Sequence, residues 1–187
     1  MYNAFFGFRE NPFNLSPDPS FFYRSPQHEE ALANLIYGVH SRKGFIVLTG
    51  EVGTGKTTIL RSLFGQLDEQ RYRLALVFNP CLTPLELLRA INREFGLPAE
   101  AADGLALLDE LNRFLLEENH AGRTPVLIID EAQNLDAVVL EQIRLLSNLE
   151  TERDKLVQIV LVGQPELDDL LDRQELRQLA QRIAVRC

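Results

Sequence analysis

Gly50-Glu51-Val52-Gly53-Thr54-Gly55-Lys56-Thr57, followed by Thr58, is the stretch of sequence that decides the fold of this chain. It has the form G-x-x-x-x-G-K-[ST], the P-loop, whose backbone amides bind the phosphates of a nucleotide. Its glycines let the chain turn tightly with no side chain between backbone and phosphate. The motif predicts that Lys56 reaches the β- and γ-phosphates and that the Thr57 hydroxyl is a ligand of Mg²⁺. Every residue from Gly50 to Thr58 is therefore a candidate nucleotide-binding residue.

The loop is flanked by a strand pattern and a helix pattern. Residues 45–49 form a short apolar run rich in β-branched side chains, which suits a buried parallel strand. After the loop, apolar residues recur at helical spacing over residues 57–67. Strand, loop and helix in this order direct backbone amides and the positive end of a helix dipole at an anion. The flanks therefore support a phosphate site rather than a simple glycine-rich turn.

The rest of the chain alternates between the same two patterns. Further strands are predicted at 74–78, 125–129 and 156–162, and residues 182–187 fit a fifth strand. Helices are predicted at 26–42, 84–95, 136–149 and 175–181, after Asp103, and from Pro165 onwards. Ser25, Thr83 and Asp136 are predicted helix caps, and Thr83 with Glu86 has the form of a capping box. The alternation predicts an α/β fold with a mostly parallel sheet between helices.

Composition is that of one soluble domain. The chain has 187 residues, 45% hydrophobic residues and a net charge of −8, which disfavours a nucleic-acid partner. Its two cysteines have neither disulfide-framework nor zinc spacing. We expect a single unit over residues 1–187, in which residues 1–24, rich in Phe, Pro and Asn, form an extended strap and residues 25–187 form the nucleotide-binding domain. The strap either only packs on the core or also walls the adenine.

Two adjacent carboxylates follow the third predicted strand. The run Val126-Leu127-Ile128-Ile129 ends in Asp130 and Glu131, and packing alone does not explain two acids there, because unpaired buried charge is costly. Asp130 is predicted to hold Mg²⁺, and Glu131 to orient and deprotonate the attacking water. No N-K-x-D or T-K-x-D guanine-reading motif occurs, so ATP is favoured over GTP.

Three further side chains are candidates for the reaction. Gln164 follows the fourth predicted strand, where it either contacts the γ-phosphate and the water or caps the helix that begins at Pro165. Arg182 and Arg177 are candidate arginine fingers, because a guanidinium beside a neighbour's γ-phosphate stabilises the charge that develops in phosphoryl transfer. The alternative for each arginine is a surface residue.

The motifs together resemble the AAA+ ATPases of the general secretion pathway protein A family, over nearly the whole chain. The resemblance is carried by Phe6-Gly7-Phe8-Arg9-Glu10-Asn11-Pro12-Phe13, by Pro17-Asp18-Pro19, by the P-loop, by Ile129-Asp130-Glu131-Ala132-Gln133-Asn134-Leu135 and by Leu161-Val162-Gly163-Gln164-Pro165-Glu166-Leu167. It implies a five-stranded AAA+ core, ATP with Mg²⁺, self-association with arginine fingers acting across subunits, and a place at the cytoplasmic face of the inner membrane. It also implies a B-type secretion partner and peptidoglycan, both contacted through regions that this chain lacks, in assembly of the secretin.

The chain departs from that family at its end. It stops at Cys187, before the helical lid, the membrane helix and the periplasmic region that the family carries, so we expect a piece of a longer protein whose nucleotide binding and turnover are weakened. Relatives with similar cores act in pilus biogenesis and exopolysaccharide export. Two other functions compete: an ATPase of DNA transposition, which the net charge disfavours, and a nucleotide-binding scaffold without turnover, against which Glu131 argues.

Overall fold

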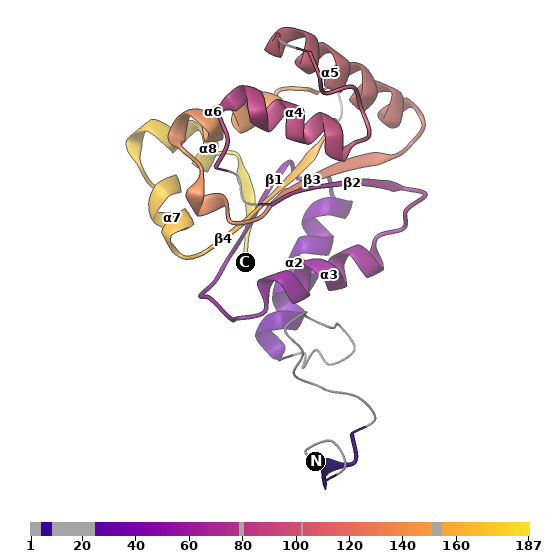
Figure 1. The fold of residues 1–187 in the computed structure, drawn as a ribbon. Coiled ribbons are helices and arrows are strands. Elements are labelled where there is room, and N and C mark those ends of the chain that lie inside the picture. Colours follow the sequence, from indigo (N-terminus) through magenta and orange to yellow (C-terminus); the bar gives the residue numbers. More distant parts are fainter. Residues whose placement is uncertain (1–4, 9–24, 79–80, 102, 151–154) are drawn as a thin grey trace.

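The fold is organised around one parallel sheet. The computed structural model describes residues 5–8, 25–78, 81–101, 103–150 and 155–187 (Figure 1). Its strands are β1 (Phe45–Thr49), β2 (Tyr72–Val77), β3 (Thr124–Ile129), β4 (Gln158–Gly163) and β5 (Ile183–Arg186). They lie in the order β2-β3-β4-β1-β5, and every neighbouring pair is parallel. The predicted α/β fold with a five-stranded sheet is confirmed.

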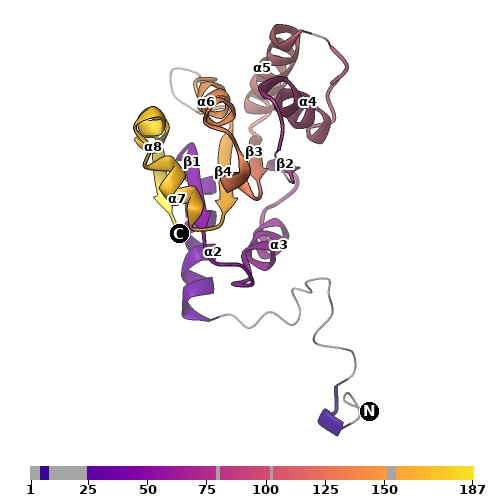
Figure 2. The ribbon, with the colours of Figure 1, turned by 60° about the vertical axis from the view of Figure 1, so that its left-hand side comes forward.

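Helices cover both faces of the sheet. One face is covered by α2 (Pro26–His40) and α3 (Lys56–Gln66), as Figures 1 and 2 show. The other face carries α4 (Pro84–Glu94), α5 (Gly104–His120), α6 (Ala137–Leu146), α7 (Glu166–Leu171) and α8 (Arg177–Ala180), with the short 3₁₀ turns η2 (Ala132–Asn134) and η3 (Gln174–Leu176). The central strands β1, β3 and β4 are thus buried on both sides, which explains their nearly continuous apolar sequences.

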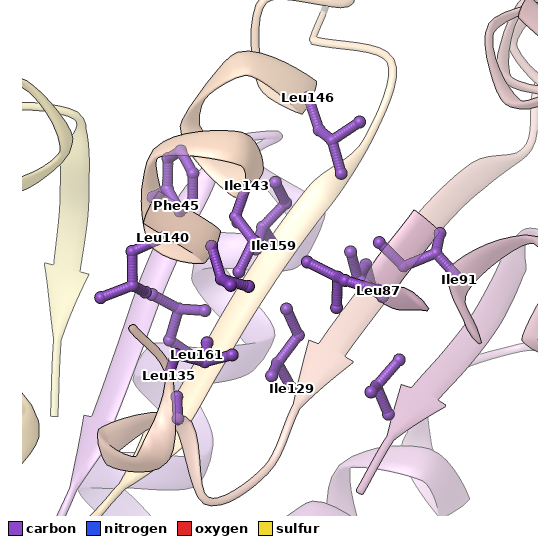
Figure 3. Close-up of a cluster of buried hydrophobic side chains, with 14 of the residues drawn as sticks. Phe45, Leu87, Ile91, Ile129, Leu135, Leu140, Ile143, Leu146, Ile159 and Leu161 are labelled. Carbon is purple, nitrogen blue, oxygen red and sulfur yellow. The ribbon is translucent and has the colours of Figure 1, made fainter. Parts of the chain in front are cut away.

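Alternate residues of β1, β2, β3 and β4 belong to two separate cores. In β1, Phe45 and Val47 face α6 and its neighbours, whereas Ile46 and Leu48 face α2 and α3. Figure 3 shows the first core, where the side chains of α6 lie over β1 and β4; Leu87 and Ile91 of α4 belong to the same core. Because successive side chains on a strand point to opposite faces, one apolar run supplies both layers. The two cores fix the sheet between its helices and so fix the edge where the strands end.

The predicted caps are largely confirmed. Ser25 caps α2, Asp103 caps α5, and Thr83 forms a complete capping box with Glu86 at the start of α4. Asp136 stands at the N-cap position of α6 but its side chain makes no capping hydrogen bond. Local sequence thus identifies where helices begin, because these side chains satisfy amides that the first turn leaves free.

Several predicted ends are wrong. The α6 helix ends at Leu146 instead of residue 149, because Ser147 closes its last turn with a 2.6 Å bond from Oγ to the Arg144 carbonyl. Strand β4 starts at Gln158 instead of residue 156, and β2 ends at Val77, so that Phe78 is 61% exposed. The helix predicted over 175–181 is divided between η3 and α8, and α2 stops at His40.

The N-terminal strap is tested only in part. Phe5 and Phe6 are helical, so the prediction of an extended backbone is wrong for them. Their rings lie 4.9 Å apart, and Phe6 stacks on Phe8 at 5.8 Å, so these exposed aromatics contact one another. Residues 9–24, and with them the proposed adenine wall, lie outside the described residues. Among the described residues, no helix is both long and apolar enough to cross a membrane.

Candidate nucleotide-binding site

The candidate residues converge at the carboxyl edge of the sheet. The P-loop follows β1, Asp130 follows β3 and Gln164 follows β4, and these three strands are neighbours in the sheet. A pocket of about 390 Å³ at this edge is lined by Val52, Gly53, Gly55, Lys56, Thr57, Thr58, Asp130, Glu131 and Gln164. Ligands of open α/β sheets bind at this edge, where the strand order places helix N-termini and loop amides. Lys56 and the two acids therefore share one pocket, as the sequence predicted.

The loop backbone has the shape that its glycines permit. Gly53 and Gly55 have φ angles of 81° and 87°, a left-handed conformation that other residues rarely adopt. A Cβ on Gly50 would lie 2.9 Å from Thr54 Oγ1, so the loop also needs glycine there for space. Gly50, Glu51 and Thr54 do not line the pocket; they shape the loop from its outer side.

Lys56 holds the two sides of the loop together. Its Nζ donates to the carbonyl oxygens of Gly50 at 2.6 Å and Glu51 at 3.0 Å. Thr54 Oγ1 donates to the same Glu51 carbonyl at 2.8 Å. The ammonium group thus lies in the pocket beside the loop amides. A bound phosphate would replace the carbonyl oxygens as its partner and would bring a full negative charge.

Asp130 is a buried carboxylate at the base of the pocket. It is 6% exposed, and its Oδ1 accepts the Glu131 backbone N–H at 2.9 Å. Burial raises the pKa of the Asp130 carboxyl above its ordinary value, and the nearby Glu131 carboxylate adds to the rise. The bond from the Glu131 amide and the charge of Lys56 oppose it. Asp130 is thus a carboxylate that gains from a further cation, which a metal-bound phosphate supplies.

Glu131 has an unusual backbone and a firmly held side chain. Its φ of 55° is one of two positive values at non-glycine residues in the described part of the chain. Such a conformation costs free energy and is concentrated at functional sites. Its Oε2 accepts hydrogen bonds from Gln133 Nε2 at 2.6 Å and from Gln164 Nε2 at 3.4 Å. The carboxylate is therefore oriented by two amides from different strand ends.

Gln133 is a site residue that the sequence reasoning missed. Besides its bond to Glu131, its Oε1 accepts the backbone N–H of Gln164 at 3.1 Å, so it joins the ends of β3 and β4. A Cβ on Gly163 would lie 2.8 Å from that same oxygen, which explains the glycine there. The available signal was the polar run after β3, but only the 3₁₀ turn η2 brings Gln133 back to Glu131.

The alternatives for Gln164 are now separated in part. The helix α7 has no side-chain cap, so the capping role is not observed, and the Gln164 amide instead contacts Glu131. Gln164 lies in the pocket beside the proposed base. Its position is consistent with the predicted role in placing the water.

The two candidate arginines do not reach this pocket. Arg182 donates to Ser147 Oγ at 2.8 Å and to Asn148 Oδ1 at 2.5 Å, beyond the end of α6. It precedes β5, whose Ile183 pairs with the first residue of β1. Arg182 therefore lies at the amino ends of the strands, whereas the P-loop follows their carboxyl ends. Arg177 is exposed at the start of α8. Neither lines the pocket of its own chain; action on a neighbour's site stays a prediction.

The oxygen atoms present suit Mg²⁺ better than a transition metal. Among the described residues, no group of three or more His, Cys, Asp or Glu side chains forms a metal cluster. Thr57 and Asp130 line the pocket together, and Mg²⁺ typically takes one or two protein oxygens, with phosphate oxygens and water completing its shell. The site therefore fits a metal that arrives with a triphosphate.

A larger pocket does not compete for the nucleotide. It measures about 560 Å³ and lies where α4 and α6 begin, with Glu86 and Asp136 as its charged lining residues. Those carboxylates repel phosphate, and the lining has no lysine or arginine.

Comparison with known proteins gives the family. A family model described as an AAA domain matches residues 39–171, which include the P-loop and the ends of β3 and β4. This chain belongs to the AAA domain family. The match extends over well more than half of the chain, so it covers the fold and not only the loop.

One curated relative is similar over the full length of this chain. It is the general secretion pathway protein A of Aeromonas hydrophila, 52% identical over 187 residues. The resemblance expected from the sequence motifs is thus confirmed. The chain covers all of its own length but 34% of the relative, so it spans about a third of that protein.

Solved structures of AAA+ proteins share the fold. The chain is similar to the Aeropyrum pernix ORC2 protein solved in ADPNP–ADP complexes, with a TM-score of 0.63 and 20% identity over 86% of this chain and 46% of that one. It is also similar to Cdc6p of Pyrobaculum aerophilum, with a TM-score of 0.64 and 24% identity over 88% and 46%. At these identities the likeness establishes the AAA+ P-loop fold alone.

Proposed function

We propose that this domain binds ATP with Mg²⁺ and hydrolyses it to ADP and phosphate. The observation that carries the proposal is that Lys56, Thr57, Asp130 and Glu131 line one pocket at the carboxyl edge of the sheet. A lysine and loop amides bind the phosphates, and a carboxylate held by two amides is placed beside them. No other class of chemistry explains this set of residues as well.

Each residue has a defined part in the reaction. The amides of Gly53 and Gly55 and the Lys56 ammonium bind phosphate oxygens, and Thr57 and Asp130 hold Mg²⁺. A metal held by these two residues would supply positive charge that offsets the charge of the phosphates. Glu131 takes a proton from water, whose oxygen bonds to the γ-phosphorus while the bond to the β–γ bridging oxygen breaks. Gln164 and Gln133 hold Glu131 in place for that transfer.

We infer the biological setting from the similarity to the relative. We place the domain in general, or type II, secretion, at the cytoplasmic face of the inner membrane, where its ATPase cycle powers assembly of the secretin. The support is the 52% identity to a general secretion pathway protein A. We also propose self-association, and contacts with a B-type partner and peptidoglycan made by parts of the relative that this chain does not cover.

A Mg²⁺-dependent ATPase assay tests the proposal. We expect phosphate release that requires Mg²⁺, and we expect Lys56→Ala to lose nucleotide binding because it removes the cation in the pocket. Lys43→Ala is a matched control, since Lys43 is exposed and lies before β1, at the other end of that strand. Binding that is equal in the Lys56→Ala variant and the parent chain would exclude the site.

A further inference from the structure

The first turn of α2 contacts the outer side of the P-loop. Nε2 of His28 lies 2.8 Å from the backbone carbonyl oxygen of Thr54. A carbonyl oxygen only accepts hydrogen bonds, so Nε2 must carry the hydrogen. The other ring nitrogen, Nδ1, lies 2.8 Å from Ser25 Oγ, the cap of α2. In the neutral ring Nδ1 is then an acceptor, and it lies closer to the Ser25 hydroxyl than the other acceptor of that hydroxyl, Gln27 Oε1 at 3.1 Å.

This bond determines how one peptide group of the loop is turned. The Thr54–Gly55 peptide is planar and trans, so its C=O and its N–H point in opposite directions. The carbonyl faces His28, outside the pocket, and Thr54 does not line the pocket whereas Gly55 does. The Gly55 N–H is therefore directed away from His28, to the side on which the phosphate binds.

Because a glycine follows Thr54, the Thr54 carbonyl needs a hydrogen-bond partner to keep this orientation. Gly55 has a φ of 87°, and a glycine adopts positive and negative φ about equally readily, so the peptide before it is easily rotated. The other bonds of Thr54 use its N–H and its Oγ1, both to the Glu51 carbonyl, and so leave the orientation of its own carbonyl to other contacts. A hydrogen-bond partner for the Thr54 carbonyl therefore keeps the Gly55 N–H directed into the pocket, where an anion would bind.

His28 is also mounted on a rigid element. Leu32, Leu35 and Val39 bury α2 against the sheet, and Gly38 lets the helix approach Ile46 of β1 closely. A side chain that must hold another group works best from such a base. The helix and the loop are thus joined at two places, through the core and through this hydrogen bond.

We propose that His28 is a positioning residue of the nucleotide site, which acts by fixing the Thr54 carbonyl and thereby aiming the Gly55 amide at the phosphate. The inference rests on the proposed function, because it needs a phosphate in the pocket. Ser25 supports His28 by holding Nδ1. The chain of contacts runs from the cap of α2 through the ring to the loop amide.

Two substitutions separate this role from simple packing. The amide nitrogen of glutamine reaches the position of Nε2, whereas that of asparagine reaches only the position of Nδ1. We therefore compare His28→Gln and His28→Asn with the parent chain, and use His120→Asn, on the exposed end of α5 at the other edge of the sheet, as the control for losing a histidine. The readouts are the Kd of MgATP by calorimetry and kcat at saturating MgATP.

We expect His28→Asn to raise the Kd of MgATP about three- to tenfold, the effect of one lost hydrogen bond, with kcat changed less than about twofold. His28→Gln should restore the Kd to within about twofold of the parent, and the thermal midpoints of all variants should agree with that of His120→Asn. Equal affinity in His28→Asn and the parent, or equal losses in both His28 variants, would overturn the inference. A parent chain that binds no MgATP would instead overturn the proposed function and, with it, this role.

Discussion

The carboxylate of Glu131 shows most clearly how single residues prepare this site. Gln133 and Gln164 both donate to its Oε2, and neither of these bonds uses Oε1. Oε1 is therefore the oxygen to which the proposed mechanism assigns the proton from water. The left-handed φ of 55° at Glu131 turns the chain so that η2 can return Gln133 to it. Strain in the backbone and two amide contacts thus act on the same side chain.

Gln133→Ala tests the importance of that orientation. Because Gln133 makes the shortest bond to Glu131, we expect kcat for ATP hydrolysis to fall about tenfold or more, with the Kd of MgATP within about twofold. Steady-state kinetics and calorimetry measure the two quantities separately. Gln174→Ala, in the exposed turn η3, is the control and should match the parent. An unchanged kcat in Gln133→Ala would show that Glu131 needs no such support.

Asp130 gives a prediction about stability and pH. Folding raises its pKa, so its ionised form is less favoured in the folded than in the unfolded chain. This cost is absent below the unfolded pKa and complete once the pH exceeds the raised, folded value. We therefore expect Asp130→Asn to increase the free energy of unfolding at pH 7 by about 1 kcal/mol, or about 2–4 °C in thermal midpoint, although it removes a proposed metal ligand.

Calorimetry at two pH values checks this sign. The advantage of Asp130→Asn should shrink as the pH falls through the raised pKa of the folded state towards that of the unfolded chain, because the parent carboxyl then takes up its proton. Asp109→Asn is the control, because Asp109 is exposed on α5. A parent chain that is more stable than Asp130→Asn at pH 7 would contradict the burial cost.

At the scale of the elements, local sequence determines where several helices begin, whereas tertiary contacts help to determine where others end. The starts of α2, α4 and α5 were predictable, since Ser25, Thr83 and Asp103 satisfy free amides within their own helix. The end of α6 was not, because Ser147 both closes the helix and accepts a bond from Arg182, 35 residues later. The tertiary contacts that help to set such ends lie outside any short window of sequence.

Two helical glycines make a matched test of helix packing. A Cβ on Gly38 of α2 would lie 2.6 and 2.8 Å from atoms of Ile46, which is fully buried in β1, whereas nothing lies within 4 Å of a Cβ on Gly65 of α3. We expect Gly38→Ala to lower the free energy of unfolding by about 1–3 kcal/mol. Gly65→Ala should raise it by about 0.5–1 kcal/mol, because alanine favours a helix. Denaturant unfolding measures both, and a stabilising Gly38→Ala would show that α2 does not pack tightly on β1.

At the scale of the whole molecule, the sequence was enough to predict the fold and the place in it where the main candidate residues gather. Alternating strands and helices indicated a parallel sheet, and the rule that ligands bind at carboxyl ends brought Lys56, Asp130 and Glu131 together. The order of the strands and the positions of Gln133 and Arg182 were not predictable, because they depend on how distant segments pair. Arg182 in particular lies about 13 Å along β1 from the P-loop, at the other edge of the sheet.

That separation leads to a prediction about assembly. If Arg182 acts on ATP at all, it acts on the site of a neighbouring copy, so specific ATPase activity should rise with protein concentration. Arg182→Ala should remove that dependence, whereas Arg113→Ala, an exposed arginine of α5 paired with Glu110, should keep it. A thermal midpoint for each variant separates this effect from the loss of the Ser147 and Asn148 bonds. A flat dependence in the parent chain would remove Arg182 from the reaction.

The most direct test of the central claim is Glu131→Gln, assayed for MgATP binding and for phosphate release side by side. Glutamine keeps the size of the side chain but removes the proton acceptor. We predict a Kd for MgATP within about twofold of the parent and a turnover lower by about a hundredfold or more. Turnover equal to that of the parent, with MgATP bound as before, would contradict the account.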